Sequence, residues 1–157
     1  MFKTKFSNKT KSIATLVAFG LIAIVLVAFG IKINAQNKTV SLDGLSYAVG
    51  TINSTNGKIN ESNYSLYSKK LGKVDGLEIK LKDNASITYK VAFYDEDKEF
   101  ISISTAQSDD FDNSDIANSA VYFRVVITPN EVDEEPVKVT VLNMFKYANM
   151  LTVTYNK

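Results

Sequence analysis

The residues best suited to recognising a ligand gather in the stretch AVYFRVVITPN, residues 120–130. Arg124 is the only arginine of the chain, and all other basic residues are lysines. In a strand, Tyr122 and Arg124 would point to the same face, because side chains alternate along the backbone. A planar guanidinium beside an aromatic ring suits sugar hydroxyls or the carboxylate of an acidic sugar. The alternative is a bidentate pair between Arg124 and a carboxylate on a neighbouring strand.

Tyr94 is the third candidate ligand contact. It ends the alternating run ITYKVAFY and stands directly before the turn DEDK, residues 95–98. At the rim of a sheet its ring could stack on a sugar. The alternative is an aromatic residue that covers the end of the hydrophobic core.

Two acidic stretches raise the question of a calcium site. These are DEDKE, residues 95–99, and DDFDNSD, residues 109–115. Asp110, Asp112 and Ser114 have the alternate spacing that opens an EF-hand loop, but the glycine and the distal glutamate of that loop are missing. Solvated loop charge is the favoured interpretation, so we expect no metal site and no cofactor.

The composition leaves few groups for catalysis. The chain has neither cysteine nor histidine, so a thiolate nucleophile, cysteine-ligated zinc and the commonest general base are absent. Glycoside hydrolysis needs two carboxylates, one of them with a pKa raised by an apolar pocket. Most acidic residues stand in turn-like runs, and the exceptions, Glu78 and Glu99, fall on expected wet faces. The sequence therefore predicts a protein that is not an enzyme.

Hydrophobic residues alternate with polar ones over much of the chain after residue 39. Leu77, Ile79 and Leu81 alternate with charged residues, and Ile87 to Phe93 and Val137 to Val141 show the same period of two. This pattern is typical of half-buried antiparallel strands. We expect strands near residues 40–51, 63–67, 76–82, 86–94, 99–105, 120–128, 137–142 and 151–155.

Turn residues separate these runs. Asp43-Gly44, Asn56-Gly57 and Asp75-Gly76 supply residues that tolerate positive φ, and Asp83-Asn84 and DEDK separate further runs. The segment VLNMFKYANM, residues 141–150, could contain one helical turn. About eight short strands with almost no helix predict an all-β fold, an antiparallel β-sandwich of the jelly-roll type.

The N-terminal part contains a long apolar run in place of the alternating pattern. Four lysines precede an uncharged run over residues 13–31, which as a helix would be about 28 Å long. This favours a transmembrane helix that keeps residues 1–12 cytoplasmic and sends the remainder outward. The alternative is a signal peptide cleaved after Ala35, although the apolar run is longer than the usual core of about 7 to 15 residues. Residues 32–38 would then be a linker.

Residues 39–157 form the expected extracytoplasmic domain. The chain of 157 residues has room for one such domain with a hydrophobic core. This part carries 12 basic and 17 acidic residues, a net charge of −5. Because nucleic acid would repel such a surface, we expect no nucleic-acid partner.

The stretch VAFYDEDKEFISIST, followed by NSAVYFRVVITP, resembles bacterial galactose-binding-like jelly rolls and carbohydrate-binding modules. In these domains a strand ends in an aromatic-Tyr-Asp turn, a Phe-Ile strand returns, and an Ala-x-Tyr-x-Arg strand follows. The resemblance covers about residues 75–142. It implies a non-catalytic sandwich that binds a sugar or cell-surface component, and that sometimes holds a structural calcium.

Two functions are therefore expected for a bacterial protein that is either anchored in the cell membrane or secreted. The first is binding of a glycan or another cell-surface component through Arg124, Tyr122 and Tyr94. The second is a structural or interaction role, in which the domain self-associates or packs against a partner and binds no small ligand.

Overall fold

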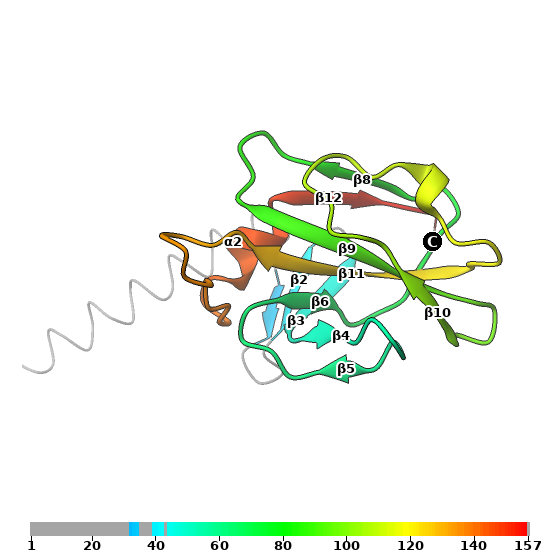
Figure 1. Cartoon of the computed structure of the whole chain (residues 1–157), viewed down its shortest axis with the longest axis horizontal. Coiled ribbons are helices and arrows are strands. Elements are labelled where there is room, and N and C mark those ends of the chain that lie inside the picture. Colours follow the sequence, from blue (N-terminus) through cyan, green and yellow to red (C-terminus); the bar gives the residue numbers. More distant parts are fainter. Residues whose placement is uncertain (1–31, 35–38, 43, 157) are drawn as a thin grey trace, which may run out of the picture. The chain divides into compact units, whose positions relative to one another are not determined.

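A computed structural model describes residues 32–34, 39–42 and 44–156, which form mostly antiparallel β-sheet (Figure 1). The basic segment and apolar helix expected at residues 1–12 and 13–31 lie outside the described residues. In the described part no helix combines the length and the apolar character that crossing a membrane requires.

The strands are short, and the two longest have eight residues each. They are β1 (Lys32–Asn34), β2 (Thr39–Leu42), β3 (Leu45–Val49), β4 (Thr51–Ile52), β5 (Ile59–Asn60), β6 (Leu66–Ser68), β7 (Gly72–Lys73), β8 (Glu78–Leu81), β9 (Ile87–Tyr94), β10 (Phe100–Ile103), β11 (Tyr122–Pro129) and β12 (Leu151–Thr154). Helical structure is limited to the 3₁₀ turn η1 (Asn113–Asp115) and the short helix α2 (Met144–Ala148).

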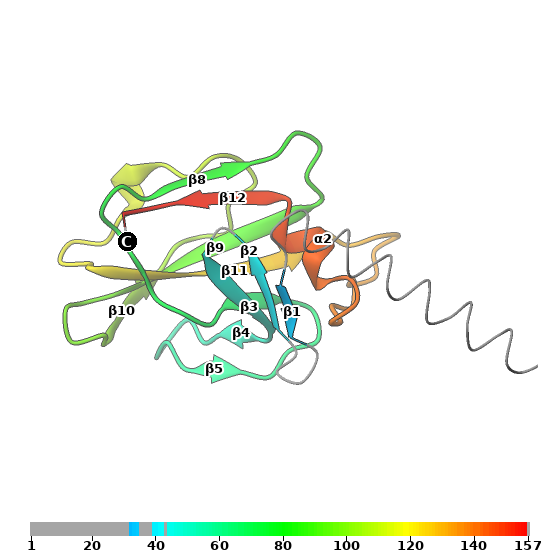
Figure 2. The same cartoon turned by 180° about the vertical axis from the view of Figure 1, so that it is seen from behind.

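Most strands join one eight-stranded sheet in the order β1-β2-β3-β6-β11-β9-β10, with β7 also paired to β11. Two smaller sheets consist of β12 with β8 and of β4 with β5 (Figure 2). The stretch expected to be a linker contributes β1, and residues 35–38 lie outside the described part.

The centre of the large sheet is the antiparallel pair β9 and β11. The pairing runs without a break from Tyr122 opposite Tyr94 to Pro129 opposite Ile87. Phe123, Val125 and Ile127 are completely buried on one face of β11. The predicted alternation on this strand is therefore confirmed. The alternation also fixes the register of β11 against β9, because a slip of one residue would expose these apolar side chains.

The buried face of this pair packs beside β8 and β12. The ring of Phe123 contacts Tyr155 edge-on at 5.4 Å between centroids, and Tyr155 directly follows β12. Phe93 of β9 contacts Phe111, whose backbone N–H donates to the carbonyl of Ile79 on β8. In both views β8 and β12 lie next to each other and alongside β9 (Figures 1 and 2).

The other face of β9 and β11 is less exposed than the alternating sequence predicts. It carries a second buried cluster, to which β4 and β6 also contribute: Ile52, Tyr67, Ala92, Tyr94 and Val126. Because β9 and β11 are buried on both faces, the positions predicted to face solvent include alanine, valine and tyrosine.

The predicted turns are confirmed where the structure describes them. Gly44, Gly57 and Gly76 all have positive φ, at 81°, 68° and 65°. Asn84 and Lys98 also adopt positive φ, at 58° and 68°, in the turns that separate β8 from β9 and β9 from β10.

Two strand predictions need correction. The stretch 40–51 is divided into β2, β3 and β4 by the Gly44 turn and by Gly50, whose φ is 145°. Residues 137–142 form no strand, although their burial alternates and Val139 is buried. Val139 donates a single backbone hydrogen bond to Asn63. Alternating burial therefore also occurs in a segment without a ladder partner, and this one runs into a turn at residues 141–143. The helical turn expected within 141–150 is confirmed as α2.

Candidate functional site

Arg124 lies in the middle of β11, and its neighbour on β9 is Ala92. The alanine leaves room above the sheet, and the guanidinium extends towards Tyr94, the next residue but one along β9. The guanidinium carbon of Arg124 lies 5.6 Å from the centroid of the Tyr94 ring, within the range of a cation–π contact. The side chain is half-buried.

The expected alternative of a carboxylate partner for Arg124 does not hold in the described part of the chain. The only ion pair found there joins Lys80 to Glu78. The Nε atom of Arg124 is buried and has no hydrogen-bond partner among the described residues. A buried donor without a partner costs free energy, and the Nε atom is enclosed by the protein and closed to solvent.

Tyr94 is buried, with an exposed fraction of 5%, and so its ring is not a surface on which a sugar can stack. Phe100 covers it with an edge-on contact of 5.9 Å between centroids. Burial raises the pKa of the Tyr94 phenol, and the charge of Arg124 opposes this rise. The hydroxyl is buried next to Arg124, whose interaction with it also opposes the rise in pKa, although the two groups form no well-aligned hydrogen bond. Tyr94 therefore supports the guanidinium from below.

Tyr122 is the more accessible of the two aromatic candidates. It is half-buried and lies directly opposite both Tyr94 on β9 and Lys73 on β7. The Nζ atom of Lys98 lies 6.0 Å from the centroid of its ring. The structure thus brings the three predicted residues together and adds two lysines to them.

Neither lysine was singled out by the sequence. Lys98 stands in a turn rich in acidic residues, and Lys73 belongs to a strand of two residues. Only the register of β7 against β11 and the fold of the 95–98 turn bring them to Tyr122. We call the set Lys73, Lys98, Tyr122 and Arg124 the Tyr122 face, with Tyr94 beneath it.

The hairpin of β4 and β5 supports this site from the same side of the sheet. Ile52 of β4 belongs to the buried cluster with Tyr94, against which Phe100 packs. In the turn of the hairpin, a Cβ atom added to Gly57 would collide with the side chain of Phe100. Glycine is therefore required for both the positive φ and the close approach to Phe100.

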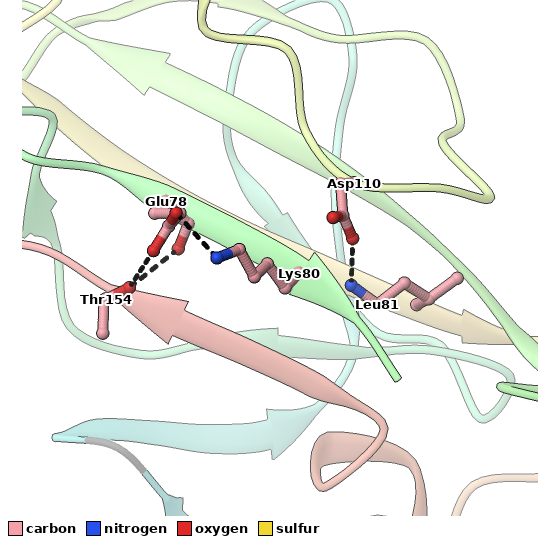
Figure 3. Close-up of polar contacts among 5 residues, drawn as sticks. All are labelled: Glu78, Lys80, Leu81, Asp110 and Thr154. Carbon is pink, nitrogen blue, oxygen red and sulfur yellow. Dashed lines mark hydrogen bonds and ion pairs between the residues drawn. The ribbon is translucent and has the colours of Figure 1, made fainter. Parts of the chain in front are cut away.

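Two aspartates of the acidic stretch 109–115 accept hydrogen bonds from backbone N–H groups. Asp110 accepts a hydrogen bond from the backbone of Leu81 at 2.9 Å (Figure 3). Asp112 accepts from the backbone of Ser114 at 2.8 Å, and this bond lowers the pKa of Asp112. Among the described residues no cluster of three acidic side chains is arranged to hold a metal ion.

Glu78 is also unsuited to act as a catalytic acid. Its carboxylate lies 2.9 Å from the Nζ atom of Lys80, two residues along the same face of β8 (Figure 3). The hydrogen bond and the charge of Lys80 lower the pKa of Glu78, whereas a general acid needs a raised pKa. Thr154 on β12 donates a longer hydrogen bond of 3.4 Å to the same side chain.

A hollow of about 490 Å³ near the β8–β9 turn contains two further carboxylates, Asp109 and Asp110. Both side chains are exposed, and the lining also includes Lys82 and Asn84. Both acids are therefore open to water and not enclosed in an apolar pocket.

No protein family, curated protein or solved structure matches the chain. The resemblance to carbohydrate-binding jelly rolls therefore depends on the motifs of residues 91–105 and 118–129. The geometry around Arg124 has to be interpreted on its own.

Proposed function

We propose that this protein is a non-catalytic binding module that recognises a glycan or another cell-surface component at the Tyr122 face. The observation that carries the proposal is the state of Arg124. Its guanidinium lies over Tyr94, has no carboxylate partner among the described residues, and reaches a half-buried position beside Tyr122. A sugar could lie against Tyr122 while its hydroxyls accept hydrogen bonds from Arg124.

The proposal also includes the arrangement of the sheets in two layers. We interpret the large sheet and the β8–β12 pair as the two layers of a jelly-roll sandwich. The contacts of Phe123 with Tyr155 and of Phe93 with Phe111 support this interpretation. In sandwiches of this kind, one sheet face can carry a ligand while the opposite face forms the core.

The test is binding of the full chain, purified in a mild detergent, to a panel of immobilised glycans. We expect at least one glycan to bind, and Arg124→Ala to lose that binding while the variant keeps the circular dichroism and melting temperature of the parent. An Arg124→Ala variant that folds and binds every detected glycan with unchanged affinity would remove Arg124 from the site. Lys138→Ala is the matched control, because this exposed lysine lies beyond the Pro129 end of β11.

We further propose that the domain is extracytoplasmic, either held by the apolar segment 13–31 or released after cleavage near Ala35. Sequencing the mature N-terminus together with membrane fractionation separates these forms. Intact Met1 in the membrane fraction supports the anchor, whereas a chain beginning at Gln36 in the medium supports secretion. An intact chain in the cytoplasmic fraction would contradict both.

A second candidate function is interaction with a protein partner or with another copy of this chain. The residues to test for it are Leu142, which is 96% exposed, and Val132, which is 61% exposed. Single exposed apolar side chains are ordinary on protein surfaces, and a contiguous apolar patch is what marks an interaction surface. Sedimentation that depends on protein concentration, and that Leu142→Ser abolishes, would support self-association. A monodisperse monomer at all concentrations would count against it.

A further inference from the structure

We infer that the Tyr122 face selects a carboxylated sugar, such as a uronic acid, over its neutral counterpart. This inference rests on the proposed function, and adds the charge of the ligand to it. It follows from how three cationic side chains are placed around one accessible aromatic ring.

Three aligned residues form the floor of the face. Lys73, Tyr122 and Tyr94 lie directly opposite one another on β7, β11 and β9. Directly opposite residues of neighbouring strands share one face of a sheet, so the ammonium group of Lys73 and the Tyr122 ring are on the same side. Lys73 is exposed and Tyr122 is half-buried.

Arg124 and Lys98 bring two more positive charges to this side. Arg124 follows Tyr122 by two residues on β11 and therefore shares its face. Lys98 itself has positive φ in the β9–β10 turn. Its Nζ atom lies close to the Tyr122 ring. None of the three cations forms an ion pair with a described carboxylate.

The acidic residues nearest to these cations in the sequence are Asp75, which is exposed two residues after Lys73, and those in the same turn as Lys98. Asp95 is engaged in the turn itself, because its Oδ1 atom accepts a hydrogen bond from the backbone of Glu99 at 2.9 Å. Glu96, Asp97 and Glu99 are exposed to solvent. Water and salt screen these exposed carboxylates and the exposed Lys73 and Lys98 alike, whereas the guanidinium of Arg124 is half-buried against Tyr94 and is screened less. Arg124 is therefore the charge on which the preference mainly depends.

This distribution of charge favours an anionic ligand over a neutral one. A carboxylate can accept two parallel hydrogen bonds from a guanidinium, and such charge-assisted bonds are roughly twice as strong as neutral ones. A neutral sugar would offer only hydroxyl acceptors to Arg124 and would leave its charge uncompensated. The acidic form is therefore expected to bind at least about tenfold more tightly, the effect of one charge-assisted bond.

The experiment compares two forms of one oligosaccharide by calorimetry on the full chain in detergent. The first is an oligogalacturonide, and the second is the same oligosaccharide after its carboxylates are reduced to primary alcohols. We expect the acidic form to bind about tenfold more tightly than the reduced form, with an affinity that falls as sodium chloride is raised. Lys73→Ala and Lys98→Ala should each weaken the acidic form more than the reduced form, whereas Lys138→Ala should change neither.

The outcomes separate this inference from the proposed function. Equal binding of the two forms would overturn the preference for a carboxylate and leave glycan binding intact. Binding of neither form, with no other glycan bound in the panel, would overturn the proposed function. The acidic form could also remain preferred in all three folded variants, Lys73→Ala, Lys98→Ala and Arg124→Gln. That result would show that the acid binds elsewhere, and it would also overturn the inference.

Discussion

The guanidinium of Arg124 lies over the ring of Tyr94, at 5.6 Å from the centroid, and takes no carboxylate partner from the described chain. An arginine that only stabilised the fold would be expected to satisfy its donors with the protein's own acceptors. Here the Nε atom of Arg124 is buried and has no hydrogen-bond partner among the described residues. In our proposal, the ring of Tyr94 holds the guanidinium in place for a ligand at the Tyr122 face.

Replacing Arg124 by methionine should change the free energy of unfolding by less than about 1 kcal/mol. The variant loses a cation–π contact with Tyr94, but it also removes a half-buried charge without a partner, and these effects oppose each other. Urea denaturation measures the difference. A loss above about 3 kcal/mol would indicate that Arg124 is a structural residue, as when a paired buried charge loses its partner.

Ser68 should be far more important for stability than its size suggests. It is completely buried on β6, and its Oγ atom accepts a hydrogen bond of 3.0 Å from the backbone of Val125. Ser68→Ala leaves this buried N–H without a partner, which should cost about 1 to 3 kcal/mol in urea denaturation. The exposed Ser54→Ala is the control and should stay within about 0.5 kcal/mol of the parent. Equal stability of both variants would be evidence against this bond.

Gly72 of β7 has no room for a side chain. A Cβ atom built there would lie within 2.6 Å of the ring carbon Cζ of Phe123, which is completely buried. Gly72→Ala should therefore cost about 1 to 3 kcal/mol through overpacking. Phe123→Leu in the same chain should relieve part of this cost, which a double-mutant cycle detects. Strictly additive losses would exclude the proposed collision.

Alkaline pH should destabilise the fold through Tyr89. This buried residue donates a hydrogen bond of 2.8 Å to the carbonyl of Asp109, and burial strongly raises the pKa of its phenol. Above the ordinary value of 10.0, the unfolded chain releases the proton while the folded state retains it. Stability should therefore fall as pH rises above about 10.

Comparison of the parent with Tyr89→Phe measures this effect. Urea midpoints recorded from neutral to alkaline pH should fall less steeply in Tyr89→Phe. Parallel slopes for the two proteins would contradict the assignment to Tyr89. Tyr94 should add a smaller contribution of the same sign, since burial also raises the pKa of its phenol.

The strands and turns were predictable from the sequence because they depend on local signals. The period of two in residues 86–94 and 120–128 corresponds to β9 and β11, and the turn residues Gly57, Gly76 and Asn84 have the positive φ expected of them. The same signal failed at residues 137–142, because alternating burial does not require a ladder partner.

The candidate site was predictable only in part. The shared face of Tyr122 and Arg124 follows from the alternation on one strand. The burial of Tyr94 depends on Phe100 and on Ile52, which come from other elements. The approach of Lys73 depends on the register of β7 against β11. Such long-range pairings leave no local pattern in the chain.

The most direct test uses the fact that Arg124 is the only arginine. In the full chain labelled with ¹⁵N-arginine, its side-chain Nε–H gives a single NMR signal. Titration with an oligogalacturonide should shift this signal saturably, because the ligand contacts the same guanidinium, and Tyr122→Ala should weaken the shift. An Nε–H signal that stays unchanged while calorimetry detects binding of the same oligosaccharide would contradict a ligand site at Arg124.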